Sequence, residues 1–223
     1  NVRILTWKKE FNYSAINNFA VREARGEYLL FLNNDVEIIT ENWLEEMLQL
    51  CQQKDVGMVG AKLYYPDDTI QHAGVVVGLG GVAAHVLCKL PRDAEGYMGR
   101  LRCVQEISAV TAACMMVKTS VFKAVGGFDE ELKVAFNDID LCMKVRKYGV
   151  KIVFTPYAEL YHYESKSRGM EDTPEKQLRF SREVNCFRRK WERELLKGDP
   201  YYNPNLTLNN TDCSLRKQEK NGD

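Results

Sequence analysis

The chain has 223 residues, of which 45% are apolar and 28% are charged, and this balance is typical of a soluble globular domain with its own core. Its 31 basic and 31 acidic side chains cancel, so we expect no nucleic acid partner and no strong attraction to an anionic membrane. No apolar run approaches the roughly 20 residues of a membrane span. Seven cysteines without a CxxC pair argue against a disulfide framework or a zinc knuckle, and favour a reducing compartment.

The first third of the chain alternates between strand and helix patterns. Its most distinctive stretch is the continuous apolar run Tyr28 to Leu32, which is typical of a strand buried on both faces. The order strand, helix, strand, helix, strand indicates an α/β fold with right-handed crossovers. The predicted elements are a strand at 2–5, a helix at 14–25, a strand at 28–32, a helix at 40–51 and a strand at 58–63.

The rest of the chain is less regular and ends in a long helix. Residues 89–102 have no clear period, so we expect a mobile loop that closes over a ligand. We divide the chain into a domain of residues 1–197 and an extended, partly disordered tail of residues 198–223, which is rich in Asn, Asp and charged residues. The predicted elements are a glycine-rich strand region at 71–81, a central strand at 108–117, a helix at 119–126, a helix at 136–148, a strand at 150–155 stopped by Pro156, and a helix at 174–197.

Acidic and imidazole side chains occur at three points where predicted elements meet. Asp35 ends an Asn-Asn-Asp cluster just after a strand, and ligands of open α/β sheets bind outside the carboxyl ends of strands. Asp138 and Asp140 lie in the first turn of a helix, and His162 follows a later strand. Each feature has a plainer interpretation, as a turn, as a complement to the helix dipole or as a structural histidine. Together they predict one site with a metal ligand, a carboxylate base and a second ligand.

These positions fall within motifs of a known family. Residues 30–35, Leu-Phe-Leu-Asn-Asn-Asp, resemble the Asp-x-Asp region of family 2 glycosyltransferases, which have the GT-A fold. Residues 135–146 are similar to that family's Glu-Asp-x-Asp-Leu-x-x-Arg element. Residues 155–165 resemble the later His segment of its bacterial polysaccharide members, especially the rhamnosyltransferase-like ones, and residues 70–74 and 199–204 are similar to that subgroup too. The parts occur in the family's order from about residue 12 to residue 206.

The resemblance implies a fold and an activity. The fold is α/β of the GT-A, Rossmann-like type, with a mixed but mostly parallel sheet flanked by helices and a long C-terminal helix. The activity is the transfer of a sugar, with inversion, from a nucleoside diphosphate sugar of the UDP or dTDP type to a growing surface glycan or lipid-linked glycan. Such an enzyme works in the cytoplasm, at the inner face of the plasma membrane.

The resemblance also implies roles for individual residues. Asp138 matches the base that takes the proton of the acceptor hydroxyl. Asp35 matches the last acid of Asp-x-Asp and, with His162, is expected to hold a divalent cation, Mn²⁺ or Mg²⁺. Asp140 is expected to orient the acceptor or the helix. The expected donor-binding residues are Asn18, Asn33 and Asn34.

The chain departs from the family's pattern in two motifs and at its start. Asn33 replaces the first acid of Asp-x-Asp, and Asn137 replaces the Glu beside the base, so both positions lose a charge. The family's N-terminal nucleobase-binding strands are not visible before Asn1. We therefore expect the chain by itself to transfer little sugar and, with an open sheet edge, to form a homodimer. Two alternatives stay open: a transferase-like binding or scaffolding domain without turnover, and another metal-dependent α/β enzyme such as a nucleotidyltransferase.

Overall fold

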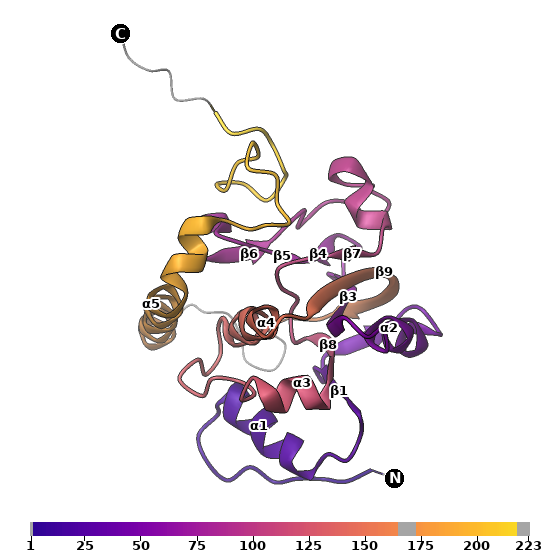
Figure 1. The fold of residues 1–223 in the computed structure, drawn as a ribbon, viewed down its shortest axis with the longest axis vertical. Coiled ribbons are helices and arrows are strands. Elements are labelled where there is room, and N and C mark those ends of the chain that lie inside the picture. The colour runs from indigo at the N-terminus through magenta and orange to yellow at the C-terminus, as the bar shows by residue number, and fades with distance from the viewer. Residues whose placement is uncertain (1, 165–172, 218–223) are drawn as a thin grey trace.

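The computed structural model describes residues 2–164 and 173–217 and shows a central sheet with helices on both sides (Figure 1). The helices are α1 (Tyr13–Glu23), α2 (Trp43–Cys51), α3 (Thr119–Ala124), α4 (Asn137–Tyr148) and α5 (Pro174–Lys197). The strands are β1 (Tyr28–Leu32), β2 (Val36–Ile38), β3 (Val56–Tyr64), β4 (Ile70–His72), β5 (Val75–Val77), β6 (Ala83–His85), β7 (Gln105–Glu106), β8 (Cys114–Lys118) and β9 (Lys151–His162). Two 3₁₀ segments, Leu79–Gly81 and Tyr97–Arg102, complete the set.

The main sheet is mixed, so the prediction of a mostly parallel sheet is wrong. Its strands follow the order β1-β8-β3-β9-β2, with β4 beside β3 and β7 beside β9. Among the described strands only β3 and β9 pair in parallel. β1 and β3 do run in the same direction, as a strand-helix-strand pattern predicts, but β8 comes from later in the chain and lies between them in the opposite direction.

The core lies on both faces of β3, which is buried along its whole length. Successive side chains of a strand point to opposite faces. Met58 accordingly belongs to the larger apolar cluster, which α1, α3, α4 and α5 cover, and Val59 belongs to the smaller cluster under α2. The two layers of helices therefore hold the strands β1 and β9, after or at whose ends Asp35 and His162 lie.

Three predicted strands differ from the observed ones. Residues 2–12 form neither helix nor strand, and the side chains of Val2 and Ile4 are exposed rather than packed on a partner strand. Of the predicted strand 108–117 only the end is β8, because residues 108–113 form no strand beyond an isolated bridge at Ala109. β9 continues through Pro156, where its pairing with β3 slips from Phe154 to Glu159; the proline lies in this bulge, where no ladder N–H is needed.

The long C-terminal helix is confirmed as α5. Thr173 caps it by accepting a hydrogen bond from the N–H of Lys176, and Pro174 occupies the first turn, where a missing N–H costs nothing. After α5 the chain returns to the domain, since Tyr202 and Leu206 belong to the larger apolar cluster. The division of the chain into a domain of residues 1–197 and a tail of residues 198–223 stays a prediction. Ser165 of the resembled His segment and residues 218–223 of the predicted tail lie outside the described residues.

Candidate active site

Asp35 and His162 lie side by side at the end of the sheet. Val36 of β2 pairs with His162, the last residue of β9, so the turn that carries Asp35 comes against the imidazole. His162 Nε2 lies 3.3 Å from Asp35 Oδ1, and both side chains are mostly buried. Asn33 Nδ2 lies 3.2 Å from the same imidazole nitrogen. The structure thus brings together three of the predicted site residues.

Gln71 fixes the tautomer of His162. The Gln71 amide nitrogen donates to His162 O at 3.2 Å and to Glu164 Oε2 at 3.4 Å, so its oxygen must be the atom that faces His162 Nδ1 at 2.7 Å. Nδ1 therefore carries the proton, and Nε2 presents a lone pair toward Asp35 and Asn33. Burial also lowers the pKa of His162, although the charges of Asp35 and Glu164 act in the opposite direction.

The Asp35–His162 pair fits a divalent cation. Asp35 Oδ1 is buried and has no hydrogen-bond partner among the described residues, and it faces another acceptor, the Nε2 lone pair. A carboxylate oxygen and a neutral imidazole are ligands that Mn²⁺ accepts. Within residues 2–164 and 173–217, however, no group of three or more His, Cys, Asp or Glu side chains is placed to hold a metal ion. The remaining ligands would have to be amide oxygens, water or the phosphates of a substrate.

Asp138 stands half-buried at the start of α4. Its Oδ2 accepts a hydrogen bond from the N–H of Ala112 at 3.2 Å, and its Oδ1 accepts one from the N–H of Ile139 at 2.8 Å. Both bonds fix the carboxylate at the positive end of the helix dipole. Tyr13 lies close by and donates to the carbonyl of Ala112 at 3.1 Å. Burial and the nearby charge of Asp138 raise the pKa of this phenol.

The irregular segment 111–113 joins Asp138 to the turn before Asp35. Ala112 holds the Asp138 carboxylate, and the next carbonyl, that of Ala113, accepts a hydrogen bond from the N–H of Asn33 at 2.9 Å. Consecutive Cα atoms are about 3.8 Å apart, so these two contacts lie within about 10 Å of each other. The predicted base and the predicted metal ligands therefore occupy one end of the sheet.

The three histidines of the chain gather around Gln71. His85 Nδ1 lies 2.9 Å from the carbonyl of Gln71 and 3.3 Å from Nδ1 of His72. The N–H of Thr111 donates to His72 Nε2 at 3.4 Å. Burial, followed by the charges of the other two histidines, lowers the pKa of His72 well below its usual range. A cavity of about 310 Å³ beside this cluster is lined by His85, His162, Glu164 and Thr111 among others.

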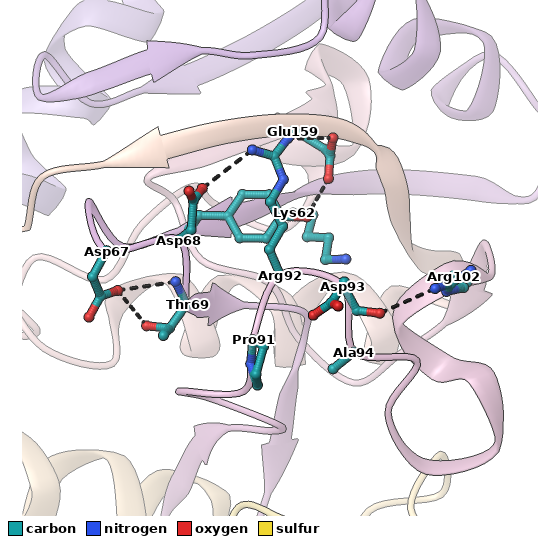
Figure 2. A pocket seen from close by; sticks show the side chains of 11 residues that line it. Lys62, Asp67, Asp68, Thr69, Pro91, Arg92, Asp93, Ala94, Arg102 and Glu159 are labelled. Atoms are coloured by element: carbon teal, nitrogen blue, oxygen red, sulfur yellow. Dashed lines mark hydrogen bonds and ion pairs between the residues drawn. The ribbon is translucent and has the colours of Figure 1, made fainter.

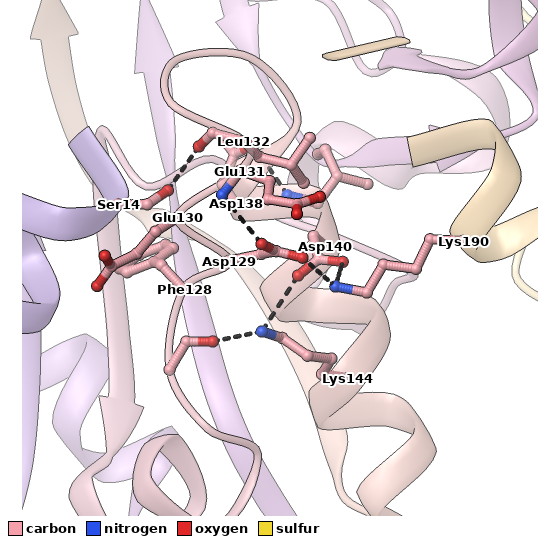
Figure 3. A network of polar contacts seen from close by, with 12 residues as sticks. Ser14, Phe128, Asp129, Glu130, Glu131, Leu132, Asp138, Asp140, Lys144 and Lys190 are labelled. Atoms are coloured by element: carbon pink, nitrogen blue, oxygen red, sulfur yellow. Dashed lines mark hydrogen bonds and ion pairs between the residues drawn. The ribbon is translucent and has the colours of Figure 1, made fainter. Parts of the chain in front are cut away.

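Asp140 points away from this site and into the contact between α4 and α5 (Figure 3). Its side chain is fully buried and accepts a hydrogen bond from Trp191 Nε1 at 2.9 Å. Lys190 Nζ lies 2.7 Å from its Oδ1, and Lys144 Nζ lies 3.1 Å from its Oδ2. Lys190 also pairs with Asp129. These contacts are those of a residue that orients helices, which is one of the two roles expected for Asp140.

The remaining predicted residues differ in how their side chains are used. The Asn18 amide donates to the Phe128 carbonyl at 3.0 Å and its oxygen accepts from the N–H of the same residue at 3.0 Å, so it holds the loop before α4. Asn34 is exposed beside Asp35. The donor-binding roles of Asn18, Asn33 and Asn34 stay predictions.

Sequence reasoning missed three parts of the site: Gln71 as the partner of His162, Tyr13 beside Asp138, and the irregular segment 111–113. Gln71 was within a segment similar to the polysaccharide subgroup, which is the one signal that pointed to it. Tyr13 is an ordinary aromatic residue on the apolar side of α1, and nothing in its neighbours marks it. The contacts of both residues span long distances in the sequence, so no local pattern could find them.

Comparison with known proteins identifies the family. A family model described as "Glycosyltransferase like family" matches residues 1–183. The chain belongs to this family of glycosyltransferase-like proteins. The resemblance of the motifs around Asp35, Asp138 and His162 to family 2 glycosyltransferases is therefore confirmed, although the roles of these residues are not tested by it.

Two relatives are long proteins of which this glycosyltransferase-like chain matches a part. It is 57% identical over 215 residues to an uncharacterized protein, y4gI, of Sinorhizobium fredii. The aligned region covers 96% of this chain and 24% of that protein. It is 42% identical over 220 residues to the O-antigen biosynthesis protein RfbC of Myxococcus xanthus. Here the aligned region covers 98% of this chain and 17% of that protein. The chain thus spans a quarter or less of the length of these curated relatives.

A solved structure confirms the GT-A type of fold. The mannosyltransferase PcManGT from Pyrobaculum calidifontis, solved in complex with GDP-Man and Mn²⁺, superposes with a TM-score of 0.55 and 15% sequence identity. The match covers 83% of this chain and 45% of that chain. None of the described helices of this chain is long and apolar enough to cross a membrane.

Proposed function

We propose that this chain transfers a sugar from a nucleoside diphosphate sugar to a hydroxyl of a growing surface glycan, with inversion at the anomeric carbon. Family membership and the O-antigen biosynthesis relative support the class of reaction. The observation that carries the proposal is segment 111–113, whose backbone contacts hold Asp138 and the turn before Asp35 at one end of the sheet. At that spacing, a base could act on the attacking acceptor hydroxyl while a cation acts on the departing diphosphate of the same donor.

Asp138 acts as the base in a single displacement. The acceptor oxygen forms a bond to the anomeric carbon, the nucleoside diphosphate leaves with the electron pair of the broken bond, and the hydroxyl proton passes to the Asp138 carboxylate. The N–H groups of Ala112 and Ile139 keep that carboxylate from rotating, so little reorganisation is needed when the acceptor arrives.

Asp35 and His162 would hold a divalent cation, Mn²⁺ or Mg²⁺, beside the diphosphate of a UDP- or dTDP-type donor. When bound, such a cation offsets the charge that develops on the departing diphosphate. Gln71 supports this role because it keeps the proton on Nδ1 and leaves Nε2 of His162 as a ligand. Asn33 and Asn34 are the amides nearest to the pair along the chain and could bind the donor's hydroxyl or phosphate oxygens.

The test is sugar transfer measured as nucleoside diphosphate release in the presence of Mn²⁺ and an acceptor glycan. Asp138→Asn should lower the rate about 10²–10⁴-fold and lower the melting temperature by only a few degrees, because the amide keeps the shape and one of the two acceptor oxygens but cannot take a proton. Asp55→Asn is the matched control, since Asp55 is an exposed acid paired with Lys151. A rate for Asp138→Asn within a few-fold of the parent would remove Asp138 from the base role.

A binding domain without turnover is the second candidate function. It is favoured by Asn33 and Asn137, which stand where the resembled motifs carry acids. The Asn137 side chain is buried and donates to the carbonyl of Val134 at 2.9 Å, so it already has a structural use. Donor binding that depends on Mn²⁺, without nucleoside diphosphate release under any acceptor, would favour this candidate over the transferase.

A further inference from the structure

A second cavity lies behind the strand that carries His162. It has a volume of about 580 Å³ and is bounded by β3, β9 and the segment 89–102. Glu159 lines it, and His162 follows three residues later on β9. Alternate residues of a strand point to opposite faces, so the side chains of Glu159 and His162 point to opposite sides of β9. The proposed transfer reaction uses none of its lining residues.

Lys62 is a buried cation without an acidic partner in this cavity. The residue is 4% exposed, and its ammonium donates to the carbonyl of Leu101 at 3.2 Å. It also lies 5.3 Å from the centre of the Tyr64 ring. In the part of the chain that the structure describes, no carboxylate oxygen lies within 4.0 Å of this ammonium. An ammonium has three donors, so two have no protein acceptor here.

Three of the four acids of the cavity, Asp67, Asp68 and Glu159, are engaged with other side chains (Figure 2). Arg92 pairs with Asp68 at 3.3 Å and with Glu159 at 3.3 Å, and the Tyr64 hydroxyl also donates to Glu159. Asp67 accepts from both the N–H and the hydroxyl of Thr69. Asp93 is exposed at the rim, where it can turn toward a ligand. Arg92 and Arg102 each lie within 4.0 Å of a carboxylate, whereas Lys62 does not among the described residues.

The charges of the lining limit the negative charge that a ligand can bring. Lys62, Arg92 and Arg102 oppose four acids, so the lining has a formal charge of −1 and disfavours a dianion such as a phosphate monoester more than a ligand whose one negative group reaches Lys62. One carboxylate could pair with Lys62, while sugar hydroxyls could donate to the rim carboxylates and accept from the guanidinium groups. These residue types are the ones needed to hold an acidic sugar.

We propose that this cavity binds a sugar that carries one carboxylate, a uronic acid, with its carboxylate on the Lys62 ammonium and its hydroxyls on the charged rim. Burial lowers the pKa of Lys62, although the charge of Glu159 acts in the opposite direction. The binding does not rest on the proposed transfer reaction, and it can be measured without a donor or a metal ion.

The test titrates the protein with sodium glucuronate, glucose and inorganic phosphate, each by calorimetry and by amide chemical shifts. Glucuronate should bind more tightly than the other two and should shift the amides of residues 92–94 and 101–102. Lys62→Met, which keeps the length of the side chain and removes its charge, should weaken glucuronate binding about tenfold or more. Lys54→Met is the matched control, because Lys54 is an exposed lysine outside the cavity.

Each outcome decides the proposal. It is overturned if glucuronate does not bind, if glucose or phosphate binds as tightly, or if Lys62→Met binds glucuronate as the parent does. If Lys62→Met does not fold, the shift map of the parent protein decides: shifts confined to other surfaces contradict the site, and shifts centred on residues 92–94 and 101–102 support it. Loss of Mn²⁺ or donor binding elsewhere on the molecule has no bearing on this result.

Discussion

Asp138 and Asp140 lie in the same helical turn but face different surroundings. Asp138 is half-buried against the N–H of Ala112, beside the turn that carries Asp35. Asp140 is fully buried between Lys144, Lys190 and Trp191. The first therefore lies beside the candidate active site, whereas the charge of the second is engaged in holding α4 to α5.

This difference predicts opposite phenotypes for the two residues. Asp140→Asn removes the anion from two buried ion pairs and should lower the free energy of unfolding by about 3 kcal/mol. Asp138→Asn leaves one backbone N–H, that of Ala112 or Ile139, without its acceptor and should lower that free energy by only about 1 kcal/mol. Urea denaturation of both variants measures the two effects, and equal losses of stability would contradict the division of roles.

At the scale of elements, α5 holds the segment that leads to Asp138. Glu183 of α5 is buried, and its carboxylate accepts from the N–H groups of Val134 at 3.2 Å and Ala135 at 2.7 Å. Burial raises the pKa of Glu183, although these N–H groups oppose the shift. Phe136 then turns the chain into α4 with a φ of 59°, so the start of that helix depends on how the segment is anchored.

Glu183→Gln tests this anchor. The amide offers one acceptor oxygen instead of two, so one N–H loses its partner and the free energy of unfolding should fall by about 1–2 kcal/mol. Amide hydrogen exchange at Val134 and Ala135 should become faster, and sugar transfer should fall with it. Glu192→Gln on the exposed side of the same helix is the control. Unchanged exchange at both amides would show that α5 does not anchor the segment.

Local patterns predicted the elements better than their arrangement. The helical spacing around Trp43 and Phe187 and the proline at 174 predicted α2 and α5, because each depends on neighbours in the sequence. The position of β8 between β1 and β3 depends on a chain reversal that no local pattern encodes. The apolar run 108–117 has the pattern of one strand, yet its first part is irregular. Ala109 makes only an isolated bridge to Val75, and the backbone of residues 111–113 bonds to His72, Asp138 and Asn33.

In the candidate active site, too, the features set by local sequence could be predicted and those set by long-range contacts could not. Asp35, Asp138 and His162 could be found because each follows or begins a recognisable element. The tautomer of His162 depends on Gln71, 91 residues earlier, and the structural role of Asp140 depends on Lys190, 50 residues later. Such contacts exist only after the chain has folded.

For the molecule as a whole, His72 should make stability depend on pH. Its folded-state pKa lies well below the unfolded value of about 6.5, so the unfolded chain binds more protons between the two values. Stability from this group is fully present above about pH 6.5 and should fall below it, by up to about 1.4 kcal/mol per pH unit. His72→Gln should flatten this slope in urea denaturation at pH 7.5, 6.5 and 5.5. An identical slope in parent and variant would contradict the buried, neutral state of His72.

The central claim is that the Asp35–His162 pair and Asp138 share one cation-dependent site. The most direct measurement is the broadening of amide signals by added Mn²⁺ in the isotope-labelled protein, in the parent, in Asp35→Ala and in the control Asp55→Asn. We predict that broadening begins at residues 33–35, 111–113, 138–139 and 162 in the parent and in Asp55→Asn, and that it disappears from these residues in Asp35→Ala. Broadening centred on another surface, or an unchanged pattern in Asp35→Ala, would contradict the account.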